Sequence, residues 1–299
     1  MARTRRLKIV GDEAYYHIIS KTVGGEYYLK DTEKEYLFSL VRGYSSLYFV
    51  EAIGFCIMSN HFHLLVKTIN NSEISNDDVT ARIGDFYKIK AEEITADQLQ
   101  RYRQKLTDIS EYVKEIKVQF LRWYNKINDR KGYFWGDRFK SVLIEDGNAL
   151  LNCLAYIDLN PVRAKVCNKP EDYRWCSIAY RLAMGEDCFL SFDGLEIRNT
   201  KEYIDFIYTE GRQERFGSDG QQAHQQQAKG KIADDGKVKL NIWKHRIRYF
   251  SDTLVIGSKT FIESSYKRFD DLLVKKDRKV HKLPLSDGIF SIRKINLNT

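Results

Sequence analysis

Cysteine is scarce in this sequence, and its five residues form no pattern that binds zinc or builds a disulfide framework. Their number is odd, and no two of them are spaced as C-x-x-C. Long apolar runs are also absent, since no stretch reaches the roughly 18 residues of a membrane-spanning helix. The basic N-terminus is followed by no apolar segment of signal-peptide length. We therefore expect an intracellular, cytoplasmic protein that does not cross a membrane.

Positive charge and aromatic rings are plentiful. The 299 residues include 49 Lys and Arg against 41 Asp and Glu, a formal net charge of +8, together with 19 Tyr and 16 Phe. Cationic side chains pair with phosphates, and rings stack on bases. The composition therefore favours a polyanionic partner, above all nucleic acid.

The first part of the chain has the apolar pattern of a β-α-β-β unit. Residues 14–23 are rich in aromatic and β-branched side chains, which is typical of a strand, and residues 32–47 have the apolar spacing of a helix. Two further strands are predicted at 48–58 and 61–68, joined by a tight turn at Ser59-Asn60. This order opens a ferredoxin-like α/β fold.

Later segments complete that fold. Residues 70–107 show only weak helical signals, whereas 109–127 form a strongly amphipathic helix. A fourth strand is predicted at 141–144. A helix over 149–159 ends at Asn160, because the residue before a proline avoids the α region. The predicted fold class is α+β, a ferredoxin-like antiparallel sheet with helices, plus a small and mainly helical C-terminal segment.

Two of the chain's six histidines, His61 and His63, flank a single phenylalanine in a predicted strand. Side chains alternate along a strand, so both imidazoles point to one face while Phe62 joins the core on the other. Imidazoles about 7 Å apart on one face can bind the same metal ion. The alternative is a pair of polar residues on a solvated face, and in either case their replacement should leave folding nearly intact.

A metal site needs a third ligand, and the segment around Tyr156 and Asn160 offers one. These residues are four positions apart, on one helix face with Cβ atoms about 6 Å apart. Asn160 can offer its side-chain carbonyl oxygen, and Tyr156 a phenol. The alternatives are an ordinary helix end before proline and a tyrosine that only packs.

Four segments of the chain, taken together, resemble a known family, the single-tyrosine HUH transposases, and within it the REP-associated tyrosine transposases. In order, they read YHIISKT, GFCIMSNHFHLLVKT, RWYNKINDRKGYFWGDRFKSVLIED, and AYIDLNPVRAKV followed by PEDYRWCS. The later segment RYFSDTLVIGSKTFIE is similar to the tail of longer members. The resemblance covers most of the chain and is least marked at 70–105 and in the segment 217–237.

The resemblance implies a nuclease that cuts and rejoins single-stranded DNA through a 5′-phosphotyrosine, on hairpin-forming repeat DNA in a prokaryotic nucleoid. His61 and His63 would be the HUH pair, and Asn160 would complete a site for a divalent metal, Mg²⁺ or Mn²⁺. Tyr156 would be the nucleophile. Tyr124 is the rival for that role, although it falls on the apolar stripe of its helix. Dimers and monomers both occur in the family, so the oligomeric state stays open.

The composition divides the chain into four parts. Residues 1–185 are predicted to form the nuclease domain and 186–216 a connecting helical segment. A Gln-, Gly- and Asp-rich stretch, 217–237, has the composition of a flexible linker. Residues 238–299 are predicted to be an accessory segment that assists DNA binding, with helices near 240–250 and 258–275.

Rings and cations are interleaved in the stretch 132–141, a composition that suits stacking on unpaired bases and contact with phosphates. Phe134 and Phe139 are equally well explained as core residues. A basic arm at the N-terminus could follow a phosphate backbone or simply be solvated. The candidate DNA-binding residues are Arg3, Arg5, Arg6, Tyr133, Trp135, Arg138, Lys140 and Arg163.

Two other classes of function remain open from the sequence. One is a protein that binds hairpin DNA without cutting it. The other is a metallohydrolase that uses a metal-bound water, in which Tyr156 is merely structural. The four remaining histidines carry no spacing signal and are expected to be structural or exposed, namely His17, His224, His245 and His281.

Overall fold

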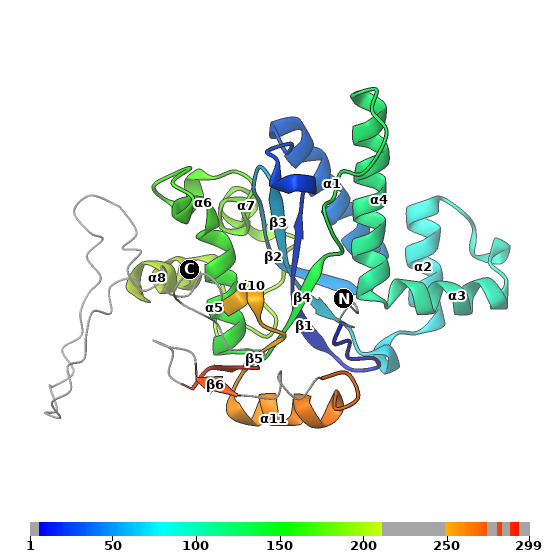
Figure 1. The fold of residues 1–299 in the computed structure, drawn as a ribbon. Coiled ribbons are helices and arrows are strands. Elements are labelled where there is room, and N and C mark those ends of the chain that lie inside the picture. The colour runs from blue at the N-terminus through cyan, green and yellow to red at the C-terminus, as the bar shows by residue number, and fades with distance from the viewer. Residues whose placement is uncertain (1–5, 211–248, 274–279, 283–287, 293–299) are drawn as a thin grey trace, which may run out of the picture.

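A central sheet organises the structure, a computed structural model that describes residues 6–210, 249–273, 280–282 and 288–292 (Figure 1). The strands are β1 Ala14–Lys21, β2 Val50–Ile57, β3 His61–Thr68, β4 Lys140–Ile144, β5 Val255–Gly257, β6 His281–Lys282 and β7 Phe290–Ser291. They form one seven-stranded sheet in the order β2-β3-β1-β4-β5-β7-β6.

Helices cover both faces of this sheet. They are α1 Asp31–Leu47, α2 Asn76–Tyr87, α3 Ala96–Leu106, α4 Ile109–Ile127, α5 Asn148–Asp158, α6 Asn160–Arg163, α7 Ser177–Met184, α8 Thr200–Glu210, α10 Tyr249–Asp252 and α11 Lys259–Arg268. None of the described helices is long and apolar enough to cross a bilayer.

The first four strands have ferredoxin-like topology. In chain order the elements run β1-α1-β2-β3, then α4 and β4, and the strands lie in the order β2-β3-β1-β4. Each neighbouring pair among these four strands is antiparallel. This arrangement is the split βαβ pattern, so the predicted α+β fold class is confirmed.

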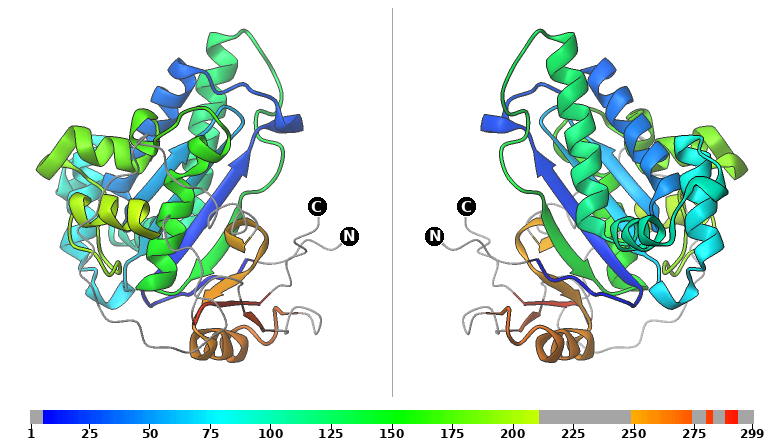
Figure 2. Two further views of the ribbon diagram at one scale, coloured as in Figure 1. Left: turned by 90° about the vertical axis from the view of Figure 1, so that its left-hand side faces the viewer. Right: turned by 90° about the vertical axis from the view of Figure 1, so that its right-hand side faces the viewer.

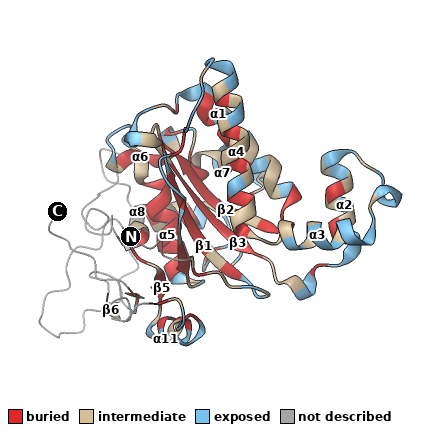
Figure 3. Ribbon diagram, turned by 45° about the vertical axis from the view of Figure 1, so that its right-hand side comes forward, coloured by how far each residue is buried: buried red, intermediate tan, exposed pale blue. Residues whose placement is uncertain are grey.

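Apolar residues are buried on both faces of the central strands (Figure 3). Phe62 belongs to the core beneath α1 and α4, whereas Leu65 belongs to a second core beneath α5. The two views in Figure 2 show these opposite sides of the sheet. Because both faces are covered, a polar side chain in the middle of β1 or β3 is withdrawn from water on either face.

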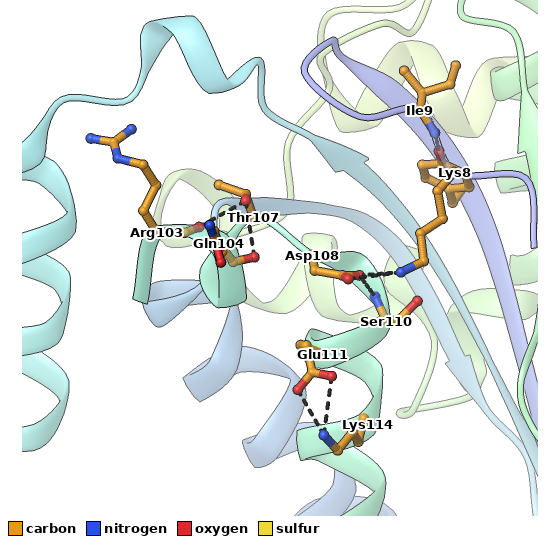
Figure 4. Close-up of polar contacts among 10 residues, drawn as sticks. Lys8, Ile9, Arg103, Gln104, Thr107, Asp108, Ser110, Glu111 and Lys114 are labelled. Carbon is orange, nitrogen blue, oxygen red and sulfur yellow. Dashed lines mark hydrogen bonds and ion pairs between the residues drawn. The ribbon is translucent and has the colours of Figure 1, made fainter. Parts of the chain in front are cut away.

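The weakly predicted region 70–107 folds into the helices α2 and α3. Ser75 and Thr95 begin these helices, and each side chain accepts a hydrogen bond from a backbone N–H of the first turn. Asp108 then begins α4 by accepting from the backbone N–H of Ser110 at 2.6 Å (Figure 4). The Lys8 ammonium donates to the same carboxylate at 2.8 Å, which fixes the start of the described chain to this corner.

The C-terminal segment extends the sheet. We predicted a mainly helical segment, and the described part contains α11 but also three short strands. β5 pairs in parallel with β4, where Leu143 N–H donates to Leu254 O at 2.9 Å. This pairing satisfies backbone groups that the edge of β4 would otherwise expose. The predicted linker 217–237 lies outside the described residues, and the predicted domain boundaries stay predictions.

One glycine lets α5 approach the sheet. Gly54 follows an irregularity in the β2–β3 register, and a Cβ there would overlap Leu154 Cδ1 of α5 and meet Ser177 Oγ at 3.0 Å. Gly54→Ala is expected to lower the free energy of unfolding by about 1–3 kcal/mol, because the buried side chains of Leu154 and Ser177 must move to make room. Thermal unfolding measures the loss.

Gly43→Ala is the matched control for this prediction. Gly43 lies inside α1, and a Cβ there meets no atom within 4 Å. Its replacement should raise stability slightly, by up to about 1 kcal/mol, because alanine favours helix. Equal stabilities of the two variants would show that α5 does not depend on the close approach at Gly54.

Candidate active site

The structure places both predicted histidines beside the predicted tyrosine. The rings of His61 and His63 lie with their centroids 5.0 Å apart, and the His63 ring lies 5.9 Å from that of Tyr156. Phe62 points to the other face, where its ring lies 5.4 Å from Trp135. Strand alternation therefore predicted correctly which side chains share a face.

That face is not solvated. His63 is 3% exposed and Tyr156 4% exposed, because α5 and the segment around Phe250 cover them. His61, at the start of β3, is only partly buried. The expectation that both histidines point away from a core is therefore wrong for His63, which lies inside the second core.

A third histidine, His17, belongs to the same cluster. Its Nε2 lies 2.8 Å from His63 Nδ1, and its Nδ1 lies 2.7 Å from the carbonyl oxygen of Phe250. The expectation that His17 is structural or exposed missed this contact. His17 pairs with Leu65 on β3, so it is a diagonal neighbour of His63 on the same face. Only the strand register reveals this contact, because the sequence spacing alone does not relate His17 to His63.

Burial keeps the three imidazoles neutral. Desolvation lowers the pKa of His17 to about 4 and, with a smaller effect of Lys21 and Arg163, lowers the pKa of His61 to about 4. Desolvation, with smaller effects of the neighbouring histidines, holds the pKa of His63 well below its usual range. Neutral imidazole is the form that binds metal ions, so these rings suit that role at neutral pH.

Asn60 orients the ring of His61. Its Nδ2 donates to the carbonyl of Gly25 at 2.9 Å, which turns its Oδ1 toward His61 Nδ1 at 2.6 Å. An amide oxygen only accepts hydrogen bonds, so His61 Nδ1 carries the proton and Nε2 keeps its lone pair.

The junction of α5 and α6 holds Asn160 against the last turn of α5, which carries Tyr156. Asn160 Nδ2 donates to the carbonyls of Tyr156 at 3.2 Å and Ile157 at 3.1 Å, in the last turn of α5. The helix does not stop at Asn160 as predicted, because α5 ends at Asp158 and Asn160 itself begins α6. Its Oδ1 hydrogen-bonds to no described residue. The contacts at the helix end and the ligand reading are thus compatible, because they use different atoms of one amide.

Arg163 encloses the tyrosine from the same junction. Its Nη2 donates to the carbonyl of Tyr156 at 2.6 Å, and its guanidinium carbon lies 4.3 Å from the centre of the Tyr156 ring. Arg163 Nη1 is buried and has no hydrogen-bond partner among the described residues. A buried guanidinium nitrogen without an acceptor is suited to bind an anion.

The C-terminal segment covers the phenol. The Phe250 ring lies 5.1 Å from that of Tyr156, and the side chain of Ser251 hydrogen-bonds with the phenol. Burial raises the pKa of Tyr156, while Arg163 and the Ser251 hydrogen bond oppose that rise. The positive charge thus offsets part of the cost of forming a phenolate.

Tyr124, the rival nucleophile, lies on α4 beneath the opposite face of the sheet. It is 8% exposed, and its ring lies 4.5 Å from Phe134 and 6.1 Å from Phe120. It packs in the first core and is remote from the histidine face.

Two candidate DNA-binding residues, Trp135 and Arg6, make contacts within the protein. The expectation that Trp135 stacks on bases is wrong, because it is 9% exposed and its Nε1 donates to Lys117 O at 3.0 Å. Arg6 donates to Phe139 O at 3.2 Å and stacks on that ring at 3.5 Å. These contacts hold Arg6 against the loop, and burial lowers its pKa to about 10.

The remaining candidates divide by exposure. Tyr133 is 83% exposed, and Arg138 and Lys140 are also exposed. Lys140 pairs with Asp252 at 3.5 Å, a contact that solvent weakens. Arg3 and Arg5 lie outside the described residues.

The side chains present fit a divalent cation held by nitrogen and amide oxygen. Within the described ranges no group of three or more His, Cys, Asp or Glu side chains has the geometry of a metal site. The Nε2 atoms of His61 and His63 and the Oδ1 of Asn160 nevertheless have no hydrogen-bond partner among the described residues. Two imidazoles and one amide oxygen leave positions open for a substrate, as a catalytic site requires.

Comparisons with known proteins add little to this geometry. No family model and no curated protein matches the sequence. Among solved structures, the chain is similar to a REP-associated tyrosine transposase bound to a REP hairpin, at 16% identity and a TM-score of 0.44. The match covers 67% of this chain and 96% of that chain. At this level of similarity the assignments above depend on the described contacts alone.

Proposed function

We propose that this chain is a metal-dependent single-stranded DNA endonuclease and strand transferase, with Tyr156 as its nucleophile. The observation that carries the proposal is one cluster of three rings. The centroids of His61 and His63 lie 5.0 Å apart, and those of His63 and Tyr156 lie 5.9 Å apart. A phenol beside two neutral imidazoles with free Nε2 atoms combines a nucleophile with a metal site.

The divalent cation would be Mg²⁺ or Mn²⁺, held by His61, His63 and Asn160. When bound, such a cation acts as a Lewis acid that stabilises negative charge on the phosphate oxygens. The proposed substrate is hairpin-forming single-stranded DNA, the class implied by the resemblance of segments such as AYIDLNPVRAKV and GFCIMSNHFHLLVKT to the REP-associated tyrosine transposases.

The chemical step is an in-line displacement at phosphorus. Tyr156 Oη forms a bond to the phosphorus, the bond from phosphorus to the 3′-oxygen breaks, and the 3′-oxygen leaves with the electron pair. In balance, the phenol proton is lost and the 3′-oxygen gains one. The new phosphotyrosine ester conserves the phosphodiester, so a DNA 3′-hydroxyl can reverse the step and join a second end.

Arg163 assists this step through its charge. Its guanidinium lies 4.3 Å from the Tyr156 ring and favours phenolate, and its unpartnered Nη1 can bind a phosphate oxygen. Because Tyr156 is 4% exposed, the side chains of Phe250 and Ser251 must shift before a DNA strand reaches the phenol.

The exposed residues of the 132–141 stretch would hold the DNA strand. The Tyr133 ring is open for stacking on a base, where one stack contributes about 1–3 kcal/mol. Arg138 and Lys140 are exposed and available to phosphates.

Covalent attachment is the direct test of this function. The protein is incubated with end-labelled single-stranded hairpin DNA and Mn²⁺, and a denaturing gel is read for a shifted, labelled protein band. Mass spectrometry of the digested band should find the nucleotide on Tyr156. Cleavage without an attached band would favour a metallohydrolase, and binding without cleavage would favour a DNA-binding protein.

Asn160 provides a prediction that separates ligand from helix cap. Asn160→Ala should weaken Mn²⁺ binding by at least ~10-fold, with adduct formation partly restored at excess Mn²⁺. Asn160→Asp keeps an oxygen ligand but loses the donations to Tyr156 O and Ile157 O. It should therefore form adduct at low Mn²⁺ yet unfold at lower temperature. Weak Mn²⁺ binding by both variants, with unchanged stability, would contradict the ligand assignment.

A further inference from the structure

We propose that His17 is a positioning residue that fixes the ring and the protonated nitrogen of His63, so that His63 Nε2 is left free to bind metal. The inference rests on the proposed function, because it explains how one ligand of the proposed metal site, His63, is held. It concerns a residue on another strand, β1, outside the His61-Phe62-His63 motif.

The direction of each hydrogen bond follows from a single fixed acceptor. The carbonyl oxygen of Phe250 can only accept, so His17 Nδ1, 2.7 Å away, must carry the proton. A neutral imidazole has one protonated nitrogen, so His17 Nε2 presents a lone pair. His63 Nδ1 lies 2.8 Å from that lone pair and must donate to it. His63 Nε2 is consequently unprotonated.

Different residues fix the proton of His61 on the corresponding nitrogen, Nδ1. Gly25 O fixes the Asn60 amide, and Asn60 Oδ1 accepts from His61 Nδ1. Both rings of the pair therefore carry their proton on Nδ1 and present Nε2. The two rings are nearly perpendicular, at 86°, and each is held by a different element of the fold. Such outer hydrogen bonds orient metal-binding imidazoles and raise their basicity.

The hydrogen bonds that run from Phe250 O through His17 to His63, called the relay below, make the C-terminal segment part of the site. Phe250 lies 233 positions from His17 in the chain, and its carbonyl is placed by α10, next to the pairing of β5 with β4. The contribution is a backbone carbonyl, so it does not depend on the Phe250 side chain. Movement of that side chain to admit DNA is compatible with an intact relay.

Two variants of His17 separate positioning from packing. His17→Phe keeps a ring but removes the acceptor for His63 Nδ1. His17→Gln keeps an oxygen that can accept from His63 and an amide that can donate to Phe250 O. Tyr16→Phe is the matched control, since Tyr16 lies on the same strand but on its other face, and the change removes a partly buried hydrogen bond that its hydroxyl accepts from Ile9 N–H.

The readouts are ¹⁵N NMR of the histidine tautomers in the metal-free, full-length protein and the Mn²⁺ dissociation constant. In the unaltered protein His63 is expected to carry its proton on Nδ1. His17→Phe should lose this preference and weaken Mn²⁺ binding ~10–100-fold. His17→Gln should recover most of the affinity, and Tyr16→Phe should bind Mn²⁺ as tightly as the unaltered protein.

The inference is overturned if His63 carries its proton on Nε2 in the unaltered protein, or if a folded His17→Phe binds Mn²⁺ normally. Should His17→Phe fail to fold, the tautomer of the unaltered protein and the affinity of His17→Gln decide instead, and a Gln variant weakened as much as ~100-fold would also overturn it. If His63 has the expected tautomer but no DNA adduct forms, only the proposed function is contradicted. If a DNA adduct forms but His63 has the other tautomer, only the role of His17 is contradicted.

Discussion

Tyr156→Phe is expected to abolish covalent attachment to DNA while leaving the fold and the metal site in place. The change removes one oxygen, and the ring keeps its contacts with Phe250 and with the Arg163 guanidinium. Only the hydrogen bond with Ser251 is lost, at a cost of about 1 kcal/mol in stability. The denaturing gel should show no shifted band at any Mn²⁺ concentration, because metal cannot replace a missing nucleophile.

Tyr124→Phe is the control for this result. It makes the same chemical change in the other core, where the ring packs on Phe134 at 4.5 Å. The Tyr124 variant should form the adduct at close to the normal rate. A shifted band from Tyr156→Phe, or its loss from a folded Tyr124→Phe, would move the chemistry to α4.

His63→Ala is expected to eliminate Mn²⁺ binding and also to destabilise the protein by about 2–4 kcal/mol. The residue is 3% exposed, so its removal leaves a cavity between His17 and Tyr156. It also leaves His17 Nε2 as a buried acceptor without a donor. Isothermal titration with Mn²⁺ and thermal unfolding measure the two effects.

His61→Ala distinguishes the two consequences. His61 is partly buried and bonds to the side chain of Asn60 near the turn, so its loss should cost less than about 1 kcal/mol of stability. Mn²⁺ binding should nonetheless fall as far as in His63→Ala. Equal losses of stability would argue against the buried relay, and retained Mn²⁺ binding by either variant would argue against the metal site.

Local periodicity explains the part of the site that could be predicted from the sequence. The alternation of a strand places His61 and His63 on one face and Phe62 on the other, whatever surrounds the strand. The helical repeat likewise places Asn160 one turn after Tyr156. Both relations depend on backbone geometry over a few residues, so they hold in the structure.

The same local patterns did not predict which of these side chains are buried. The ring of Trp135 was expected to meet DNA, but it packs against Phe62 from the far side of the sheet. Replacement of His63 was expected to leave folding nearly intact, but Tyr156 of α5 lies against its ring and the residue is buried. Whether a face is covered depends on elements far away in the chain. A local pattern of residue types does not show which distant element packs on that face.

What the sequence by itself determined is therefore the ferredoxin-like order of elements, the pair of histidines on one strand face and the tyrosine one turn before an asparagine. Only the tertiary structure decided that His17 joins them, since the register of β1 against β3 makes it a diagonal neighbour of His63. It also decided that the Phe250 carbonyl closes the relay from the C-terminal segment. Strand register and edge pairing are set by the sum of many contacts between distant segments, which is why no single motif could specify either.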